Sequence, residues 1–424
     1  MKSLFRSLIL HILIFLARKR LQSTHAKIIG ITGSVGKTTC KEAIVHILSK
    51  KFKVFTSQKS YNTEFGVPLT ILEEESGESS PLLWFPILLR GFKKAYFSPI
   101  EAEYIVLEYG VDKPGDMTQL IEICTPNIAV ITKIAAVHLA PGQFDSLEEI
   151  FKEKIILAKE VGKKSSNLII LNSEDTLQKQ WITTYHGEAK LRAFGYQANT
   201  SEVQTTPKGL HATFHFEDFE LANIELNIIG QWHLETILPA LIIGKEAGMS
   251  ESECSAQLQT FRLPPGRLSL IEGTGDTLLI DSSYNASPLA VKESLKILEE
   301  VPHKRRVFVF GNMNELGKTS EELHRSVAPY ILSHVDLLLT VGPGPKATVE
   351  TLLTQGFPAD NIHTFDHVQE VISWYSAHKE AGDTILVKGS QNNVRLEHFV
   401  KAHMKHPELA PSLLVRQSES WIKK

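Results

Sequence analysis

Between an apolar strand pattern and a helical pattern, the chain reads Gly30-Ile31-Thr32-Gly33-Ser34-Val35-Gly36-Lys37-Thr38-Thr39. A glycine-rich turn in this position points several backbone N–H groups at one place, where they can bind phosphate oxygens. The lysine adds a charge for the outer phosphates, and the hydroxyl that follows it can hold Mg²⁺. Five residues instead of four separate Gly30 from Gly36, so the fit to the strict P-loop pattern is off by one. We predict a nucleotide-phosphate site made by Gly33, Ser34, Gly36, Lys37, Thr38 and Thr39, and the alternative is a glycine-rich turn with a surface lysine.

Length and composition are those of an ordinary globular protein with two or three domains. The chain has 424 residues, of which 42% are hydrophobic and 22% charged. A net charge of −3 provides no basic field that would argue for a nucleic-acid partner. The three cysteines, Cys40, Cys124 and Cys254, are far apart and have no metal-ligand spacing. This usage suits the reducing cytoplasm, where we expect the protein to act.

Two apolar segments flanked by cations depart from this picture. Residues 8–17 are apolar except for His11, and basic residues lie on both sides of them. These ten residues are too few to span a bilayer, which needs about 20, and no small-residue cleavage site follows. Residues 81–97 mix aromatic and aliphatic side chains with Arg and Lys, as interfacial elements do. Two readings stay open: contact with the inner face of the membrane, or packing on the protein itself or at a dimer contact.

Apolar strand patterns alternate with helical patterns along most of the chain. In the first half, strands are predicted at 104–110, 127–132 and 168–172, and in the second half at 277–281, 307–311, 337–342 and 384–389. This alternation predicts an α/β fold with parallel sheets and helices on both faces. Functional side chains are then expected at the carboxyl ends of strands, where Glu108 and Thr132 stand.

Breaks in this pattern suggest the domain boundaries. Residues 190–228 alternate in polarity and favour an antiparallel patch, and the Pro-Pro-Gly sequence at 264–266 favours a hinge. We therefore predict an apolar segment at 1–26, an ATP-binding domain at 27–262 with an insertion at about 76–100, and a Rossmann-like domain at 263–424 that ends in a helical, polar tail.

Eight motifs in one order resemble those of the Mur ligases, and most closely those of the MurF type. They cover residues 32–39, 61–70, 108–116, 132–139, 266–268, 280–288, 311–317 and 386–390. The resemblance implies a P-loop NTPase-type domain followed by a Rossmann-like domain. It also implies an ATP-dependent ligase in which a substrate carboxylate and ATP form an acyl phosphate. An amine, D-alanyl-D-alanine or a similar one, then attacks to give an amide of a peptidoglycan peptide precursor.

The resemblance also assigns roles to individual residues. Lys37, Glu108, His138 and Lys154 match catalytic positions. Thr38 and Glu108 match ligands of the Mg²⁺ on ATP, His138 and Glu108 match ligands of a second Mg²⁺, and Lys154 matches a lysine that is carbamylated. The nucleotide in the second domain is matched by Arg267, Asp281, Tyr284 and Asn285, and the substrates by Asn62, Lys388 and Ser390.

The chain departs from the family pattern in three places. Residues 230–236 replace a stretch that approaches adenine, although Trp232 could stack on a base. Asn312 stands where the family has Asp. Only about 26 residues precede the P-loop strand, too few for the UDP-sugar-binding domain of the family. A ligase or amidating subunit that acts on a lipid-linked precursor, and a non-catalytic scaffold, are therefore the alternative functions, and the amine and the oligomeric state stay open.

Overall fold

The computed structural model describes residues 2–57, 61–77, 80–135, 142–206, 209–301, 303–314, 316–390, 394–417 and 421. The chain forms two compact units. The first comprises Met1–Ser201, Phe214–Leu221 and Trp232–Leu258, and the second comprises Glu202–Thr213, Ala222–Gln231 and Gln259–Lys424. His138, one of the predicted metal ligands, lies outside the described residues.

The first unit contains a six-stranded sheet in the order β2-β3-β1-β4-β5-β6, in which all neighbouring strands are parallel. The central strands β3, β4 and β5 are buried along their whole length, as their continuous apolar sequences predict. The strands are β1 (Lys27–Thr32), β2 (Val54–Thr56), β3 (Tyr104–Glu108), β4 (Ile128–Ile131), β5 (Leu168–Asn172) and β6 (Lys190–Phe194). The predicted parallel α/β fold is confirmed.

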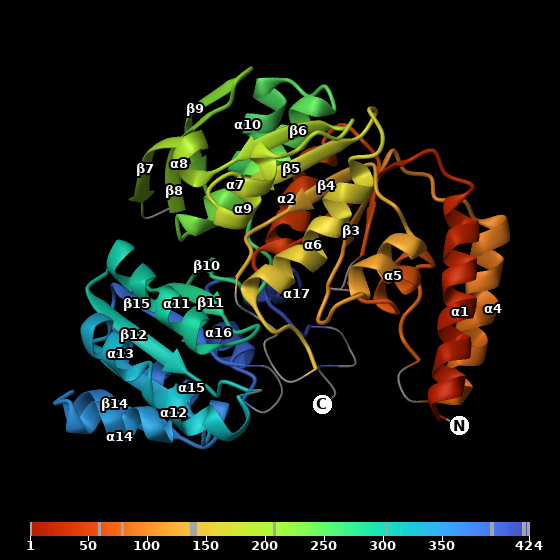
Figure 1. Cartoon of the computed structure of the whole chain (residues 1–424). Coiled ribbons are helices and arrows are strands. Elements are labelled where there is room, and N and C mark those ends of the chain that lie inside the picture. The colour runs from red at the N-terminus through yellow and green to blue at the C-terminus, as the bar shows by residue number, and fades with distance from the viewer. Residues whose placement is uncertain are drawn as a thin grey trace. The chain divides into compact units, whose positions relative to one another are not determined.

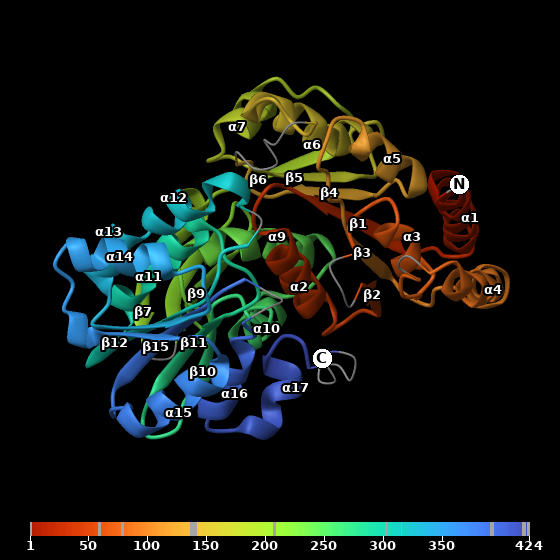
Figure 2. The same cartoon turned by 90° about the horizontal axis from the view of Figure 1, so that it is seen from below.

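Helices cover both faces of this sheet (Figure 2), with α5, α6 and α7 on one side and α2 and α9 on the other. Local capping fixes where some of them begin; the Ser146 side chain, for example, accepts a hydrogen bond from the Glu149 N–H at the start of α6. The helices are α2 (Lys37–Leu48), α3 (Gly66–Ile71), α5 (Asp116–Ile123), α6 (Leu147–Val161), α7 (Thr176–Thr183), α8 (Tyr196–Asn199), α9 (Trp232–Glu246) and α10 (Glu251–Thr260).

Two further helices, α1 (Lys2–Leu21) and α4 (Pro81–Phe97), contain the two apolar segments and lie side by side (Figures 1 and 2). Their inner faces join the core of the first unit through Leu13 and Ala17 of α1 and through Trp84 and Ile87 of α4. Of the two readings left open for these segments, packing on the protein itself therefore holds for one face of each helix. Among the described residues, no helix is long and apolar enough to cross a membrane.

Residues 190–228 do not form one antiparallel patch, so the prediction for this segment is wrong for residues 190–194. Residues 190–194 form β6, which pairs in parallel with β5 at the edge of the large sheet. The alternating polarity of β6 reflects this half-exposed edge position, with only Phe194 buried. The rest forms a separate sheet in the order β7-β8-β9, made of β7 (Thr200–Thr206), β8 (Gly209–His215) and β9 (Glu220–Leu226).

The second unit is built on a sheet in the order β10-β11-β15-β12-β13-β14, with β10 antiparallel to β11 and all other pairs parallel. Its strands are β10 (Ser269–Glu272), β11 (Leu278–Ser282), β12 (Arg305–Phe310), β13 (Leu337–Val341), β14 (Ile362–Phe365) and β15 (Asp383–Lys388). The short strands β10 and β14 were not predicted, because each has only four residues and lies at an edge.

Helices flank this second sheet, and the chain after α16 returns to its core through Ala410 and Leu414. The tail is therefore not the purely polar tail that was predicted. The helical segments are α11 (Pro288–Glu300), η1 (Gly317–Thr319), α12 (Ser320–Arg325), α13 (Ala328–His334), α14 (Lys346–Thr354), η2 (Ala359–Asn361), α15 (Val368–His378), α16 (Glu397–His403), η3 (Pro407–Leu409) and α17 (Ala410–Leu413).

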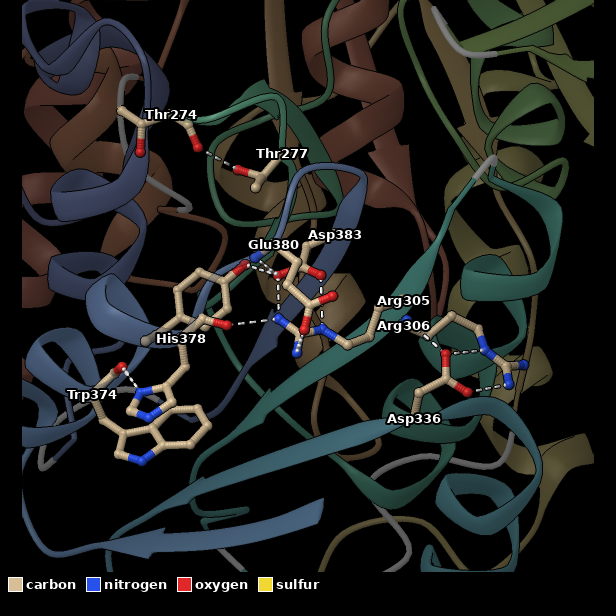
Figure 3. A network of polar contacts seen from close by, with 10 residues as sticks. Thr274, Thr277, Arg305, Arg306, Asp336, Trp374, His378, Glu380 and Asp383 are labelled. Atoms are coloured by element: carbon tan, nitrogen blue, oxygen red, sulfur yellow. Dashed lines mark hydrogen bonds and ion pairs between the residues drawn. The ribbon is translucent and has the colours of Figure 1, made fainter. Parts of the chain in front are cut away.

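A polar network closes the amino-terminal end of the second sheet (Figure 3). The Arg305 guanidinium donates two hydrogen bonds of 2.8 Å to the buried Asp383 carboxylate, which also accepts one from the Tyr375 hydroxyl at 2.6 Å. Arg306 forms a similar pair with Asp336. These charges join the starts of β12 and β15 and the residue before β13, at the opposite end of the sheet from the predicted site residues. We assign them a structural role.

All three cysteines are buried and form no disulfide. Burial raises the pKa of the Cys124 thiol to about 12 and that of Cys254 to about 11. The pKa of Cys40 is raised further, by burial and by the nearby charge of Glu108.

Candidate active site

The glycine-rich turn connects the carboxyl end of β1 to the start of α2, so the first N–H groups of α2 are available to an anion. Gly33 has a φ of +142°, and a Cβ there would lie 2.0 Å from the Thr132 hydroxyl oxygen at the end of β4. Gly36 also has a positive φ, and a Cβ there would lie 2.7 Å from Thr236 at the start of α9. Both positions therefore require glycine.

Neighbouring segments hold this turn in place. The Thr132 hydroxyl donates to the Val35 carbonyl at 2.7 Å, and the Ser34 N–H donates to the Lys133 carbonyl at 2.8 Å. The Lys37 ammonium donates to the Gly33 carbonyl at 2.7 Å and is only partly exposed, and Thr39 is buried. The turn is thus shaped before any ligand arrives, with Lys37 folded over it.

Thr38 and Glu108 meet beside the turn. The Thr38 hydroxyl lies 3.3 Å from Glu108 Oε2, which stands at the end of β3. Glu108 is buried, and its Oε1 accepts no hydrogen bond from the described residues. A hydroxyl and a carboxylate are oxygen ligands of the kind that Mg²⁺ prefers, so these two residues fit the ion that accompanies a nucleoside triphosphate.

Lys41, which sequence reasoning missed, is the buried cation beside this carboxylate. Its side chain is 1% exposed, and its Nζ lies 3.7 Å from Glu108 Oε1. It also donates to the Ser57 carbonyl at 3.0 Å and pairs with Glu42 at 3.0 Å. A lysine one turn after Lys37 on an amphipathic helix is usually exposed, so only the long-range packing reveals its role.

Asn62 is brought to the same strand end. Its carbonyl accepts a hydrogen bond of 2.7 Å from the Gly110 N–H, two residues after Glu108. A Cβ at Gly110 would lie 2.6 Å from the Asn62 side-chain carbon. The predicted substrate residue Asn62 therefore lies against Gly110, in the segment that follows β3.

Lys154 on α6 is buried, with only 1% of its surface exposed. Burial lowers the pKa of its amine to about 7, and the nearby positive charge of Lys37 lowers it as well. Its neighbours behave differently: Lys152 is exposed, and Glu153 accepts a hydrogen bond from the Met117 N–H at 2.7 Å. Of the charged residues 152–154, Lys154 is the amine held beside the phosphate-binding turn.

A pocket of about 550 Å³ adjoins this turn at the carboxyl ends of β4 and β5. The Ser34 N–H of the turn donates to the Lys133 carbonyl, and a Cβ at Gly36 would lie 2.7 Å from Thr236. The pocket is lined by Lys133 and by Glu235, the neighbour of Thr236. Glu235 accepts a hydrogen bond from the Asn172 side-chain amide, and burial raises the pKa of Glu235. The other lining residues are Ser173, Glu174, Asp175, Thr176, Lys179 and Gln197.

In the second unit, Lys388 and Asp281 stand at the carboxyl ends of the paired strands β15 and β11. The Lys388 ammonium donates to the Ser282 hydroxyl at 2.9 Å and to the Asn285 carbonyl at 3.2 Å. Burial, and then the charge of Arg267, lower the pKa of Lys388 to about 8. Burial raises the pKa of Asp281 to about 6, and its Oδ2 accepts no hydrogen bond from the described residues.

Ser390 links three loops of this cluster. Its hydroxyl donates to the Asn285 side chain at 2.8 Å and accepts from the Asn314 N–H at 3.0 Å. Its own N–H donates to the Asn312 carbonyl at 2.7 Å. Asn312 in turn accepts from the Gly344 N–H at 2.8 Å, so its amide is used structurally.

Arg267 and Tyr284 form a second contact in this unit. The Arg267 guanidinium carbon lies 4.5 Å from the centre of the Tyr284 ring, a cation–π arrangement that leaves the guanidinium partly exposed. The predicted residues thus form two clusters. Gly33, Ser34, Gly36, Lys37, Thr38, Thr39, Asn62, Glu108 and Lys154 lie in the first unit, and Arg267, Asp281, Tyr284, Asn285, Lys388 and Ser390 lie in the second.

A parallel sheet with a P-loop, followed by a second, Rossmann-like sheet with polar residues at its strand ends, defines an α/β nucleotide-binding protein of two units. Comparison with protein families narrows this class. Residues 31–244 match the Mur ligase middle domain, and residues 266–391 match the Mur ligase glutamate ligase domain. The chain belongs to the Mur ligase family.

Individual relatives agree with this assignment. The UDP-N-acetylmuramoyl-tripeptide–D-alanyl-D-alanine ligase of Rickettsia prowazekii is 27% identical over 388 residues, which are 89% of this chain and 78% of the relative. The enzyme of the same name from Bacillus subtilis is 26% identical, and the match covers 92% of this chain and 79% of the relative. The crystal structure of MurF from Thermotoga maritima in complex with ADP is similar in fold, with a TM-score of 0.71, 24% identity and coverage of 94% and 84%.

Proposed function

We propose that this Mur ligase is of the MurF type and joins a carboxylate of a peptidoglycan peptide precursor to the amine of D-alanyl-D-alanine, with ATP as the second substrate. The observation that carries the proposal is the Thr38–Glu108 pair beside the P-loop, in a chain whose relatives from Rickettsia prowazekii and Bacillus subtilis are named for this activity. The pair supplies the ion-binding oxygens that phosphoryl transfer from ATP requires.

The reaction has two steps. A carboxylate oxygen of the precursor attacks the γ-phosphorus of ATP, so that an acyl phosphate forms and ADP leaves. The amine nitrogen then attacks the acyl carbon, phosphate leaves and the nitrogen loses a proton, which gives the amide. The P-loop N–H groups and Lys37 hold the phosphates in place and balance the negative charge that develops in the first step.

We propose that Mg²⁺ is held by Thr38 and Glu108, where it would neutralise phosphate charge and polarise the reacting oxygens. A second Mg²⁺ with His138 as ligand is proposed from the family resemblance. The pocket beside the P-loop is proposed to take the adenine base, with Glu235 as an acceptor for its exocyclic amine. Arg267, Asp281, Tyr284 and Asn285 are proposed to act on the nucleotide, and Asn62, Lys388 and Ser390 on the substrates.

We also propose that Lys154 is carbamylated. A carbamate forms when a neutral amine attacks CO₂ and loses a proton, so an amine with a pKa near 7 reacts far more readily than an ordinary lysine. The product is an anion beside Lys37, which would replace an unfavourable contact between two cations with an attraction. Intact mass in bicarbonate buffer, compared between wild type and Lys154→Arg, tests this modification. An unmodified amine in active enzyme would disprove it.

The activity is tested by phosphate release and product mass with a panel of acceptors and amines. We expect turnover with ATP, UDP-linked muramoyl-tripeptide and D-alanyl-D-alanine, and none when either substrate is left out. Turnover only with a lipid-linked acceptor would favour the alternative ligase. If no acceptor supports turnover in protein that binds ATP, the scaffold reading gains support and the proposal fails.

A further inference from the structure

The outer side of the α1–α4 pair is an apolar surface. Fourteen large apolar side chains are exposed among the described residues, and nine of them lie on these two helices. They are Phe5, Leu8 and Phe15 of α1, and Leu83, Phe85, Leu89, Phe92, Tyr96 and Phe97 of α4. We call these nine residues the α1–α4 apolar face. Monomeric proteins in water seldom gather so many exposed apolar side chains in one place, and such patches usually mark an interaction site.

The two helices run side by side in the same direction (Figures 1 and 2). Near their ends, the Lys19 ammonium lies 5.5 Å from the centre of the Tyr96 ring. Further back along both helices, a Cβ at Gly91 would lie 3.6 Å from Leu16 Cδ1. With 17 residues, α4 alone extends this surface over about 25 Å.

The charges on these helices identify the chemistry of the partner. Neither helix contains an acidic residue, and together they carry eight lysines and arginines. Several are held by acidic residues of other segments, as Arg20 is by Glu73 and Arg90 by Glu74. Arg18 donates to the Glu122 carbonyl, and Lys93 is exposed on α4. Exposed aromatic and aliphatic side chains interleaved with cations suit an anionic lipid surface.

We propose that the α1–α4 apolar face docks on the surface of a bilayer that contains anionic lipid, without crossing it. The inner faces of both helices stay in the protein core, so the pair lies on the membrane as a fixed part of the first unit. A second copy of this chain is a poorer occupant, because neither helix has an acidic residue that could pair with the exposed Lys93 of the other copy across a symmetric contact.

The test is co-sedimentation of the full chain with vesicles of phosphatidylcholine, with and without phosphatidylglycerol. We expect binding to the anionic vesicles and little binding to the neutral ones. The double variant Phe85→Ser/Leu89→Ser alters side chains that are 74% and 62% exposed, so the fold should persist, which a thermal melt checks. It should bind about tenfold or more weakly, because two apolar anchors are lost. Lys93→Ala should weaken binding about fivefold at low salt. At high salt this effect should be smaller, because salt screens the attraction between the lysine and the anionic lipid.

The matched control is Leu289→Ser, because Leu289 is 63% exposed on α11 in the second unit and should not affect vesicle binding. Wild-type protein that stays in the supernatant, equal binding to both vesicles, or a double variant that binds like wild type would each overturn the proposal. So would light scattering that shows a dimer which the double variant dissociates. Ligation of soluble substrates should be unchanged in the double variant, so failure here is distinct from failure of the proposed activity.

Discussion

Lys41 Nζ lies 3.7 Å from Glu108 Oε1, and both side chains are only 1% exposed. The P-loop helix thus places a buried cation behind the carboxylate that faces Thr38. This pair holds a negative charge in a site that would otherwise disfavour it, because an isolated carboxylate out of water is costly.

Removing this cation should destabilise the first unit. Lys41→Met leaves the buried Glu108 charge without its partner, and we expect the free energy of unfolding to fall by about 3–5 kcal/mol. Urea denaturation measures this change, and the exposed Lys50→Met serves as the control, with an expected change within about 0.5 kcal/mol. Equal midpoints for the two variants would show that the pair contributes nothing.

Removing the P-loop lysine should abolish the chemistry. Lys37→Ala deletes the cation that balances the transferring phosphoryl group, so we expect kcat to fall roughly a thousandfold or more. Phosphate-release kinetics at saturating ATP measure kcat, with Lys50→Ala as the control. Near-normal turnover in a folded Lys37→Ala protein would contradict the assignment of the turn as a phosphate site.

The low pKa of Lys154 predicts a pH dependence of stability in CO₂-free buffer. Its pKa is about 7 in the folded protein and 10.5 in the unfolded chain, so the unfolded chain binds the extra proton between these values. The contribution of Lys154 to the free energy of unfolding therefore rises as pH increases from about 7 toward about 10. Below about pH 7 the amine is charged in both states, so the full cost of burying a charged amine is present. Lys154→Met removes the cost, so its stability advantage over wild type should be larger at about pH 6.5 than at about pH 9.

Denaturant midpoints at the two pH values measure that difference, and the exposed Lys152→Met on the same helix should show no pH-dependent advantage. In bicarbonate, Lys154→Ala should be nearly inactive and regain part of its activity with acetate, while Lys152→Ala should keep full activity. If Lys152→Ala were the inactive variant instead, the assignment of the carbamylated lysine to Lys154 would be wrong.

Glu235 should influence the choice of nucleotide. A carboxylate accepts a hydrogen bond from the amine of adenine but repels the carbonyl at the same position of guanine. Glu235→Gln can donate to that carbonyl, so we expect the ratio of kcat/KM for ATP over GTP to fall by about tenfold. The exposed Glu188→Gln is the control. An unchanged ratio would place the base elsewhere than in the pocket lined by Glu235.

The parts of this structure that could be predicted from sequence are those fixed by local pattern. The strand, turn and helix around Lys37 and the buried strand ending at Glu108 follow from apolar runs and glycines that lie within a few residues of each other. The burial of Lys41 and Lys154 could not be predicted, because both lysines are on helices whose sequences also suit exposed lysines. Their environment is set by strands and helices far away in the chain.

The pairing of α1 with α4 was beyond sequence reasoning for the same reason. Each segment was recognised as apolar, but the contact of Lys19 with the Tyr96 ring joins residues 77 positions apart, and no local pattern encodes it. Likewise, Asn172 and Glu235 line one pocket only because β5 and α9 meet beside the P-loop. Edge strands such as β6 were misread because half-exposed parallel strands alternate in polarity like antiparallel ones.

The burial of all three cysteines makes this chain suited to site-specific labelling. Cys40, Cys124 and Cys254 are buried with raised pKa values, so at neutral pH they offer almost no thiolate to a maleimide or a nitroxide reagent. A single cysteine introduced at an exposed position would therefore carry a fluorophore or spin label without removal of the native thiols. Labels could be attached one at a time along α4 and on the second unit, and the native cysteines would stay unlabelled in each case.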